Sequence, residues 1–413
     1  MALIVQKFGG TSVGTIARIQ NVAQRVARTR AAGHDVVVVA SAMAGETNRL
    51  LALGAELTKS PDPRELDALV ATGEQVSVAL LAIALNAIGV PARSFLAHQV
   101  QLRTDSAFTK ARIRGIDGEK LVEATREGKV AIVAGFQGVD DEGNVTTLGR
   151  GGSDTSAVAI AAALGQGVVC EIYTDVDGVY TADPNIVKNA RKVSRISYEE
   201  MLELASLGAK VLQIRSVELA MKYAVPVHVR SSFADLDKDW GVEGTWVVGE
   251  DESLESVVVA GVTSDKNEAQ ITVRRIPKGT RSVAGLFSAL AESRVSVDMI
   301  IQNPSVDGAT DLTFTVPKGE LEKAQSIAKA KVTELGGPVE VTAREDVVKV
   351  SIVGLGMRSH AGVAAKMFRL LADEGISIDA VSTSEIKVSC LIASKYGELA
   401  VRALHDGFGL GDE

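Results

Sequence analysis

The chain has 413 residues and a formal net charge of −8 at pH 7; 46% of its residues are hydrophobic and only 4% are aromatic. This length predicts two or three domains with cores of aliphatic side chains. The acidic balance argues against a nucleic-acid partner. The two cysteines lie far apart without CxxC spacing, so we expect neither a disulfide framework nor a metal held by side chains.

The N-terminus carries a short apolar run without a basic region before it, which is typical of a first strand rather than a signal peptide. No stretch of about 18 uncharged apolar residues occurs, so no membrane-spanning helix is expected. The sequence therefore predicts a cytoplasmic protein without a membrane partner.

From residue 1 to about residue 232, short apolar runs alternate with helical patterns. Buried strands are predicted at 2–8, 35–41, 129–135 and 168–174, and the clearest helices at 73–88 and 154–164. This alternation predicts an α/β domain with a largely parallel sheet covered by helices on both faces. Ligands on such sheets bind beyond the carboxyl ends of the strands, so the residues that follow the strands are the candidate site.

A glycine turn follows the first predicted strand. Lys7 stands near the end of that strand, and Gly9 and Gly10 precede a helix. Glycines let backbone N–H groups approach an anion closely, and a helix N-terminus adds a favourable dipole. In a Walker A motif the lysine follows the glycines, so this turn is either another kind of phosphate site or a plain tight turn.

A second glycine turn precedes the helix predicted at 154–164. Arg150 lies among its glycines, and Ser153 or Asp154 is a natural N-cap. A capped helix after a flexible turn is the simpler interpretation. An arginine beside a helix N-terminus can also clamp a carboxylate through two hydrogen bonds. Together with Lys7, Arg150 would place two cations near one anionic site.

The polar turn that follows the strand at 168–174 contains Thr174, Asp175 and Tyr180. Its carboxylates resemble a calcium loop, but the DxDxDG spacing and the terminal glutamate are absent. A loop that binds the ribose of a nucleotide, with Tyr180 beside the base, is more plausible. A plain polar turn stays open as the alternative.

Three further polar positions belong to the candidate site. Ser41 and Thr47 follow the second strand and suit a small polar substrate. Glu74 lies at the start of a predicted helix. Its carboxylate either only interacts favourably with the helix dipole or also binds the ammonium group of a substrate. Lys210 is a candidate for binding phosphate, although by itself it would be an ordinary surface lysine.

The remainder of the chain contains an internal repeat. Residues 284–298 and 365–379 each predict a helix leading into a strand, and alternating strands flank each copy. We interpret them as two βαββ-type modules that pack on one another, preceded at 233–260 by a return strand or linker. Two such modules after a catalytic-looking domain indicate a sensor domain. The alternative is that they serve only to join copies of the chain into an oligomer.

Taken together, these segments closely resemble aspartokinase, the family with the amino-acid-kinase fold that phosphorylates the β-carboxylate of aspartate. The matching segments are 7–12, 41–43, 45–48, 73–74, 149–155, 174–180 and 208–211. The repeats look like the two ACT domains of that family, notably at 298–303 and 381–386. The resemblance covers essentially the whole chain. It implies a catalytic domain over 1–245, a linker or return strand over 246–265, and ferredoxin-like ACT domains over 266–340 and 341–413.

The resemblance also implies roles for single residues, with L-aspartate and ATP with Mg²⁺ as the substrates. Lys7 contacts the transferring phosphoryl group and Asp154 orients Lys7. Arg150 binds the α-carboxylate of aspartate and Glu74 its ammonium group. The other implied substrate residues are Ser41, Thr47, Gly152 and Ser153, and the other implied MgATP residues are Gly9, Gly10, Thr174, Asp175, Tyr180, Asn185, Lys210 and Val211.

Two departures from the family pattern bear on ATP binding and on regulation. Asn185 stands where the family usually has an arginine that helps to bind the nucleotide. In the first ACT domain, Lys278 replaces an expected acid and Arg281 an expected glycine. This turn normally covers an amino-acid effector at the ACT interface, so we expect altered or reduced feedback inhibition. The expected regulatory residues are Lys278, Arg281, Gln302, Asn303, Ser382, Thr383 and Ser384.

The resemblance further implies the first step of lysine, threonine and methionine biosynthesis. It also implies lysine or threonine as effectors at the ACT interfaces, and a homodimer or higher oligomer. Two other functions remain as alternatives. One is another enzyme of the amino-acid-kinase fold, and the other is a non-catalytic amino-acid sensor with a degenerate kinase domain. A dinucleotide oxidoreductase is less plausible, because the only suitable glycine cluster, at 353–356, lacks a third glycine.

Overall fold

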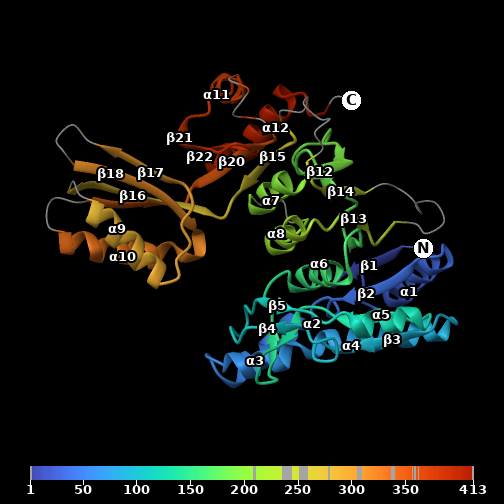
Figure 1. Cartoon of the computed structure of the whole chain (residues 1–413). Coiled ribbons are helices and arrows are strands. Elements are labelled where there is room, and N and C mark those ends of the chain that lie inside the picture. The colour runs from blue at the N-terminus through green and yellow to red at the C-terminus, as the bar shows by residue number, and fades with distance from the viewer. Residues whose placement is uncertain are drawn as a thin grey trace. The chain divides into compact units, whose positions relative to one another are not determined.

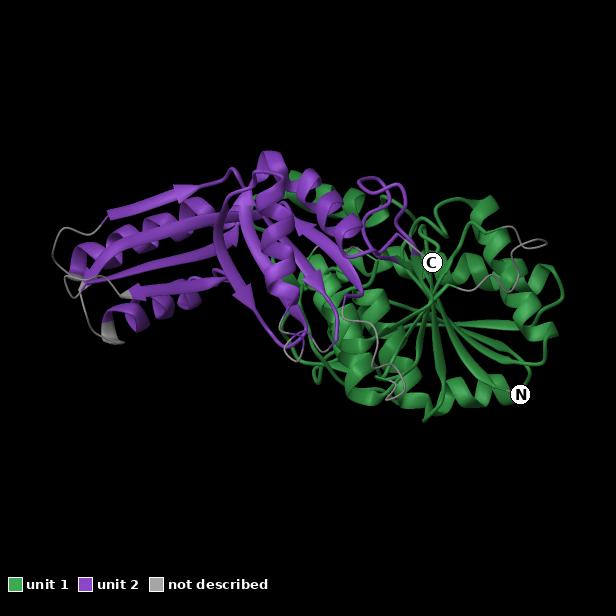
Figure 2. Cartoon of the chain, turned by 90° about the horizontal axis from the view of Figure 1, so that it is seen from above, with its two compact units in different colours: residues 1–179, 192–254 green, residues 180–191, 255–413 purple. Residues whose placement is uncertain are grey.

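The computed structural model of the chain (Figure 1) describes residues 2–207, 211–234, 244–250, 259–277, 280–304, 309–335, 340–355, 357, 360 and 362–411. The chain divides into two compact units (Figure 2). The first comprises Met1–Val179 with Lys192–Leu254, and the second comprises Tyr180–Arg191 with Glu255–Glu413.

The first unit is built on an eight-stranded sheet in the order β12-β14-β13-β9-β1-β2-β6-β3. The strands are β1 (Leu3–Phe8), β2 (Asp35–Ala40), β3 (Ala92–Phe95), β6 (Val130–Ala134), β9 (Val169–Thr174), β12 (Arg195–Ser197), β13 (Val227–Ser231) and β14 (Thr245–Val248). β1 pairs in parallel with β2 and β9, whereas β14 runs antiparallel to β13. The prediction of a largely parallel sheet is therefore confirmed.

Helices flank this sheet on both sides (Figure 2). The helices of the first unit are α1 (Ile16–Ala31), α2 (Glu46–Leu57), α3 (Pro63–Val70), α4 (Thr72–Ala87), α5 (Glu119–Arg126), α6 (Gly152–Leu164), α7 (Tyr198–Ser206) and α8 (Ile214–Tyr223). Val36 and Val38 of β2 pack in one core with Ile19 of α1 and Leu81 of α4. A strand buried on both faces favours β-branched residues, which explains the unbroken valine run of β2.

A stretch across α3 and α4, Pro63–Ala87, is long and apolar enough by composition alone to span a membrane. Half of its most apolar window is buried inside the protein, and Leu81 and Leu85 are fully buried in the core of the first unit. These contacts are typical of a core helix in a globular domain.

Short strands complete the first unit. A four-stranded sheet in the order β5-β4-β7-β8 contains β4 (Arg103–Thr104), β5 (Ile113–Gly115), β7 (Gln137–Val139) and β8 (Val145–Thr147). A separate two-stranded ribbon joins β10 (Val179–Tyr180) to β11 (Lys192–Val193). This ribbon brackets residues 181–191, which together with Tyr180 belong to the second unit.

The second unit contains two four-stranded antiparallel sheets, in the orders β17-β18-β16-β19 and β15-β20-β22-β21. The first sheet has β16 (Glu268–Pro277), β17 (Ile300–Pro304), β18 (Ala309–Pro317) and β19 (Glu340–Arg344), with α9 (Thr280–Glu292), a 3₁₀ turn (Lys318–Glu320) and α10 (Leu321–Leu335). The second has β15 (Gly261–Asp265), β20 (Val347–Val353), β21 (Ile378–Thr383) and β22 (Lys387–Ala393), with α11 (Val363–Asp373), a 3₁₀ turn (Ser394–Tyr396) and α12 (Gly397–Gly407).

Each sheet with its helices has the ferredoxin-like arrangement expected for the repeats. β15 lies within the predicted linker 246–265, and it pairs antiparallel with β20 at the edge of the second sheet. The second module is thus completed by a strand that precedes the first module in the chain. The predicted boundaries of the domains stay predictions.

Candidate active site

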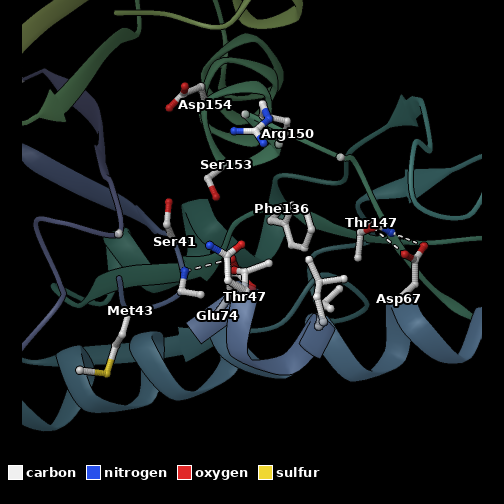
Figure 3. Close-up of a pocket in the computed structure, with 18 of the residues that line it drawn as sticks. Ser41, Met43, Thr47, Asp67, Glu74, Phe136, Thr147, Arg150, Ser153 and Asp154 are labelled. Carbon is white, nitrogen blue, oxygen red and sulfur yellow. Dashed lines mark hydrogen bonds between the residues drawn. The ribbon is translucent and has the colours of Figure 1, made fainter. Parts of the chain in front are cut away.

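A pocket of about 540 Å³ opens in the first unit, where the carboxyl ends of β1 and β2 meet the first turns of α2, α4 and α6. Figure 3 places Ser41, Glu74 and Ser153 around the same space. The predicted site residues that line the pocket are Lys7, Gly10, Ser41, Thr47, Glu74, Arg150, Gly152, Ser153 and Asp154. The polar turns that follow separate strands in the sequence therefore meet in one cavity.

Lys7 and Asp154 form an ion pair at this pocket. Lys7 Nζ lies 2.6 Å from Asp154 Oδ1, and the two side chains are only 10% and 12% exposed. β1 carries Lys7 next to its last residue, and Asp154 stands in the first turn of α6, where the helix dipole favours a carboxylate. A largely desolvated ammonium group is therefore held at the pocket by a partner of opposite charge.

The backbone beside Lys7 approaches its neighbours closely. A Cβ atom on Gly10 would lie 2.9 Å from the carbonyl oxygen of Ala42, so a larger residue would push the two turns apart. The N–H of Gly9 donates to the carbonyl oxygen of Tyr173 at 3.3 Å. Gly10 thus lets β1 and β2 present their turns to the same pocket, while the Gly9 N–H is engaged by the main chain.

The N-terminus of α6 differs from the sequence prediction. The N-cap is Gly151, with φ 70°, rather than Ser153 or Asp154, and the helix begins at Gly152. A Cβ atom on Gly151 would lie 1.8 Å from Cγ of Gln213, so both the left-handed backbone and the close contact require glycine. Because glycine lets the helix begin earlier, Ser153 and Asp154 stand inside the first turn and face the pocket.

Glu74 is almost fully buried, at 3% exposure, in the first turn of α4. The main-chain N–H of Ala42 donates to Oε1 at 2.9 Å, whereas Oε2 is buried without a hydrogen-bond partner among the described residues. Burial raises the pKa of Glu74 to about 7. The pocket therefore contains a carboxylate oxygen that a positively charged ligand group could satisfy.

Asp67 is a pocket residue that sequence reasoning missed. It is fully buried on α3 and accepts hydrogen bonds from the N–H of Thr109 at 2.8 Å and from the N–H and hydroxyl of Thr147 at 2.7 and 2.6 Å. Desolvation raises its pKa against the effect of these bonds. The sequence shows only a single aspartate on the apolar side of a short helix. From that pattern the hydrogen-bond partners, which lie far along the chain, cannot be identified.

Among the expected ATP-binding residues that the structure describes, only Lys7 and Gly10 line this pocket. Thr174 and Asp175 stand at the end of β9, and the Thr174 hydroxyl donates to Asp175 Oδ1 at 3.1 Å. Val211 is half-buried in a turn, and Lys210 lies outside the described residues. Tyr180 and Asn185 belong to the second unit.

Asn185 is exposed, and both its main-chain N–H and its side-chain amide donate to Asp183 Oδ1 at 2.9 Å. Asn185 is therefore part of a local turn at Asp183.

The expected regulatory residues lie in the second unit. Lys278 and the side chain of Arg281 are outside the described residues, and Gln302 and Asn303 are exposed on β17. Ser382 and Thr383 end β21, and Ser384 follows it. Thr383 and Ser384 line a pocket of about 370 Å³ together with Met357, His360, Val363, Ala364, Glu385 and Val388.

Across the described part of the chain, no group of three or more His, Cys, Asp or Glu side chains is arranged to hold a metal ion. The two cysteines are free and buried, and burial raises the pKa of each thiol.

Comparison with known proteins gives concordant results along the chain. The amino acid kinase family matches residues 2–231, and the ACT domain matches residues 350–408. The aspartate kinase of Pseudomonas putida is 54% identical over 410 residues, which cover 99% of this chain and 98% of the relative. The aspartokinase of Pseudomonas aeruginosa is 53% identical over 412 residues, with the same shares covered.

Two solved structures of E. coli aspartokinase III resemble this chain over 98% of its length and 99% of their own. The complex with aspartate and ADP has a TM-score of 0.80 at 26% identity. The complex with lysine and aspartate has a TM-score of 0.77 at 27% identity.

Proposed function

The chain belongs to the aspartokinase family, and we propose that it transfers the γ-phosphoryl group of ATP to the β-carboxylate of L-aspartate in the pocket around Lys7 and Asp154. The observation that supports this most is the set of charges at the pocket. Lys7 and Arg150 are cations suited to phosphoryl and carboxylate groups, and the Glu74 oxygen that has no partner among the described residues suits an ammonium group. Aspartate carries two carboxylates and one ammonium, so its charges complement this set.

The chemistry needs no general base, because a carboxylate is already a nucleophile. An oxygen of the β-carboxylate attacks the γ-phosphorus, the bond from that phosphorus to the β,γ-bridging oxygen breaks, and ADP leaves with the electron pair. Catalysis then depends on alignment and on neutralising charge at the phosphoryl oxygens. We assign the neutralising role to Lys7, whose ammonium group Asp154 holds at 2.6 Å.

Arg150 and Glu74 are proposed to bind the α-carboxylate and the ammonium group of aspartate. Ser41, Thr47, Gly152 and Ser153 would complete the substrate site by hydrogen bonds. Ser153 is 7% exposed, so a hydrogen bond from a bound ligand would form largely out of water.

We assign MgATP to Gly9, Gly10, Thr174, Asp175, Tyr180, Asn185, Lys210 and Val211. The hydroxyl of Thr174 and the exposed carboxylate of Asp175 are oxygen groups of the kind that Mg²⁺ prefers, although two such residues do not make a protein cage. Mg²⁺ would therefore be held mainly by the ATP phosphates and would neutralise part of their charge.

The activity is tested by ADP release coupled to a spectroscopic readout, with hydroxylamine added to trap an acyl phosphate as its hydroxamate. Aspartate-dependent ADP release with a matching amount of hydroxamate is expected, and glutamate, acetylglutamate and carbamate should give neither. Lys7→Ala should lose both signals by about 10²- to 10³-fold while its melting curve stays cooperative. ADP release with another acceptor would favour a different kinase of this fold, and no release with any acceptor would favour a sensor without catalytic activity.

The second unit is proposed to bind an amino-acid effector at its ACT modules and to join the chain into a homodimer or higher oligomer in the cytoplasm. Reversing the charge of the effector turn through Lys278 should disfavour a cationic effector, since like charges repel. Inhibition should therefore be weak with lysine alone and is to be measured with lysine, threonine and both. Strong inhibition by sub-millimolar lysine alone would overturn this part of the proposal. The enzyme would act at the start of lysine, threonine and methionine biosynthesis.

A further inference from the structure

Residues 180–191 are packed into the second ACT module rather than into the sheet of the first unit (Figure 2). Ala182 and Val187, at 4% and 2% exposure, belong to one hydrophobic core with Val350 of β20, Met367 of α11 and Leu404 of α12. This segment contains Tyr180 and Asn185, which we assign to the nucleotide. Part of the proposed ATP loop is thus built on the core of a regulatory module.

A buried polar contact holds the start of the segment. Thr181 Oγ1 and His405 Nε2 are hydrogen-bonded at 2.9 Å, and His405 on α12 is fully buried. The N–H of Arg191 also donates to Thr181 Oγ1, at 3.0 Å, and the N–H of Val262 donates to the Thr181 carbonyl oxygen at 2.7 Å. Thr181 therefore ties both ends of the segment to α12 and to the start of β15.

The end of the segment is held near the C-terminus. Arg191 Nε donates to the carbonyl oxygen of Leu410 at 2.9 Å, and Asn189 Nδ2 donates to Asp406 Oδ1 at 3.4 Å. Between these anchors, Asn185 and Asp183 form the exposed turn. A loop fixed at both ends loses less conformational entropy when it binds a ligand than a loop that is free.

We propose that Thr181 and His405 are positioning residues for ATP, because their hydrogen bond holds Tyr180 and Asn185 in the conformation that receives the nucleotide. This proposal rests on the assignment of ATP to that loop in the proposed function. The residues that line the aspartate pocket all belong to the first unit, and none lies on residues 180–191. Loss of the contact should therefore weaken ATP binding and leave aspartate binding nearly unchanged.

The test uses the full chain and two pairs of variants. Thr181→Val and His405→Met remove the hydrogen bond between these residues with little change in volume. Thr181→Ser and His405→Gln can retain it. For the first pair, the KM for MgATP and its Kd by calorimetry should rise about three- to tenfold, the range expected for one hydrogen bond, with the KM for aspartate and kcat within twofold. The second pair should restore most of the affinity. Arg402→Ala, an exposed position on the same helix, is the matched control and should match the wild type.

Thr181→Val also removes the oxygen that accepts from the Arg191 N–H. The double variant Thr181→Val/His405→Met should therefore be no worse than Thr181→Val alone, because the contact with His405 is lost once. Unchanged MgATP affinity in folded Thr181→Val, or equal losses for ATP and aspartate, would overturn the positioning role. Tyr180→Ala separates the two proposals. If it weakens ATP binding while Thr181→Val does not, the site assignment stands and the positioning role fails. If neither variant affects ATP binding, both fail.

Discussion

The main-chain N–H of Ala42, just beyond β2, donates a hydrogen bond of 2.9 Å to one oxygen of Glu74, and the other oxygen of that buried carboxylate has no partner among the described residues. The carboxylate is thereby aimed into the pocket but only half satisfied. Burial raises the pKa of this group to about 7, so without a ligand it is mostly protonated below that pH and mostly ionised above it. Two predictions depend on this relationship.

The first concerns aspartate affinity and pH. Because the pKa of free-enzyme Glu74 is raised to about 7, the carboxylate that binds the ammonium group becomes available as pH rises through that value. The KM for aspartate should fall about tenfold between pH 6 and pH 8, with the inflection near the Glu74 pKa. Glu74→Gln should show a high, nearly pH-independent KM. A wild-type KM that stays flat over this range, or a variant that keeps the slope, would contradict the assignment of Glu74 to the ammonium.

The second concerns stability in the absence of substrate. The folded-state pKa of Glu74 is raised from 4.5 to about 7, so the folded state binds more protons than the unfolded state between these values. The unfolding free energy should therefore fall as pH rises through this window, by about 3 kcal/mol from this group. Glu74→Gln should remove that loss and be more stable than the wild type at pH 8, but not at pH 4. Denaturant titrations at both pH values measure the difference, and an equal effect at both would refute the linkage.

Asp154→Asn should reduce kcat by about 10²-fold or more with a small effect on the KM for aspartate. The amide keeps the shape of the carboxylate, but it removes the charge that holds Lys7 Nζ at 2.6 Å, so the ammonium group is no longer oriented for the transition state. Steady-state kinetics with both substrates varied give the two parameters. A variant with normal kcat and a raised KM would instead place Asp154 in ground-state binding.

Asp67→Asn should destabilise the first unit by about 2–4 kcal/mol and raise the KM for aspartate. The carboxylate accepts from Thr109 and Thr147 in a fully buried position, and an amide would turn an NH₂ group toward some of those donors. Glu65→Gln, an exposed change on the same helix, is the control and should be neutral. Melting curves together with the KM check the result, and an unchanged KM in a destabilised variant would limit Asp67 to a structural role.

The secondary structure and the local motifs were predictable from the sequence because both depend on residues close together in the chain. The unbroken run of valines in β2 strongly favours a strand that is buried on both faces. Lys7 and Gly10 are close together in the chain, so the composition of their turn already raises a phosphate site as one interpretation, with a plain tight turn as the other. The repeated patterns at 284–298 and 365–379 likewise predict two similar modules.

Pairings between distant residues depended on the tertiary structure. The residues around Asp67 in the sequence do not identify Thr147 as its hydrogen-bond partner. The sequence assigned β15 to a linker, and only its pairing with β20 in the structure shows that it is part of a sheet. The sequence left open whether Glu74 interacts only with the helix dipole. Its burial against the Ala42 turn raises its pKa, and one of its oxygens has no partner in the part of the chain that the structure describes. The sequence by itself therefore determined the family, the elements and the reactive residue types. Only the fold decided which of them meet, because burial and hydrogen-bond partners are properties of packed surfaces and not of chain neighbours.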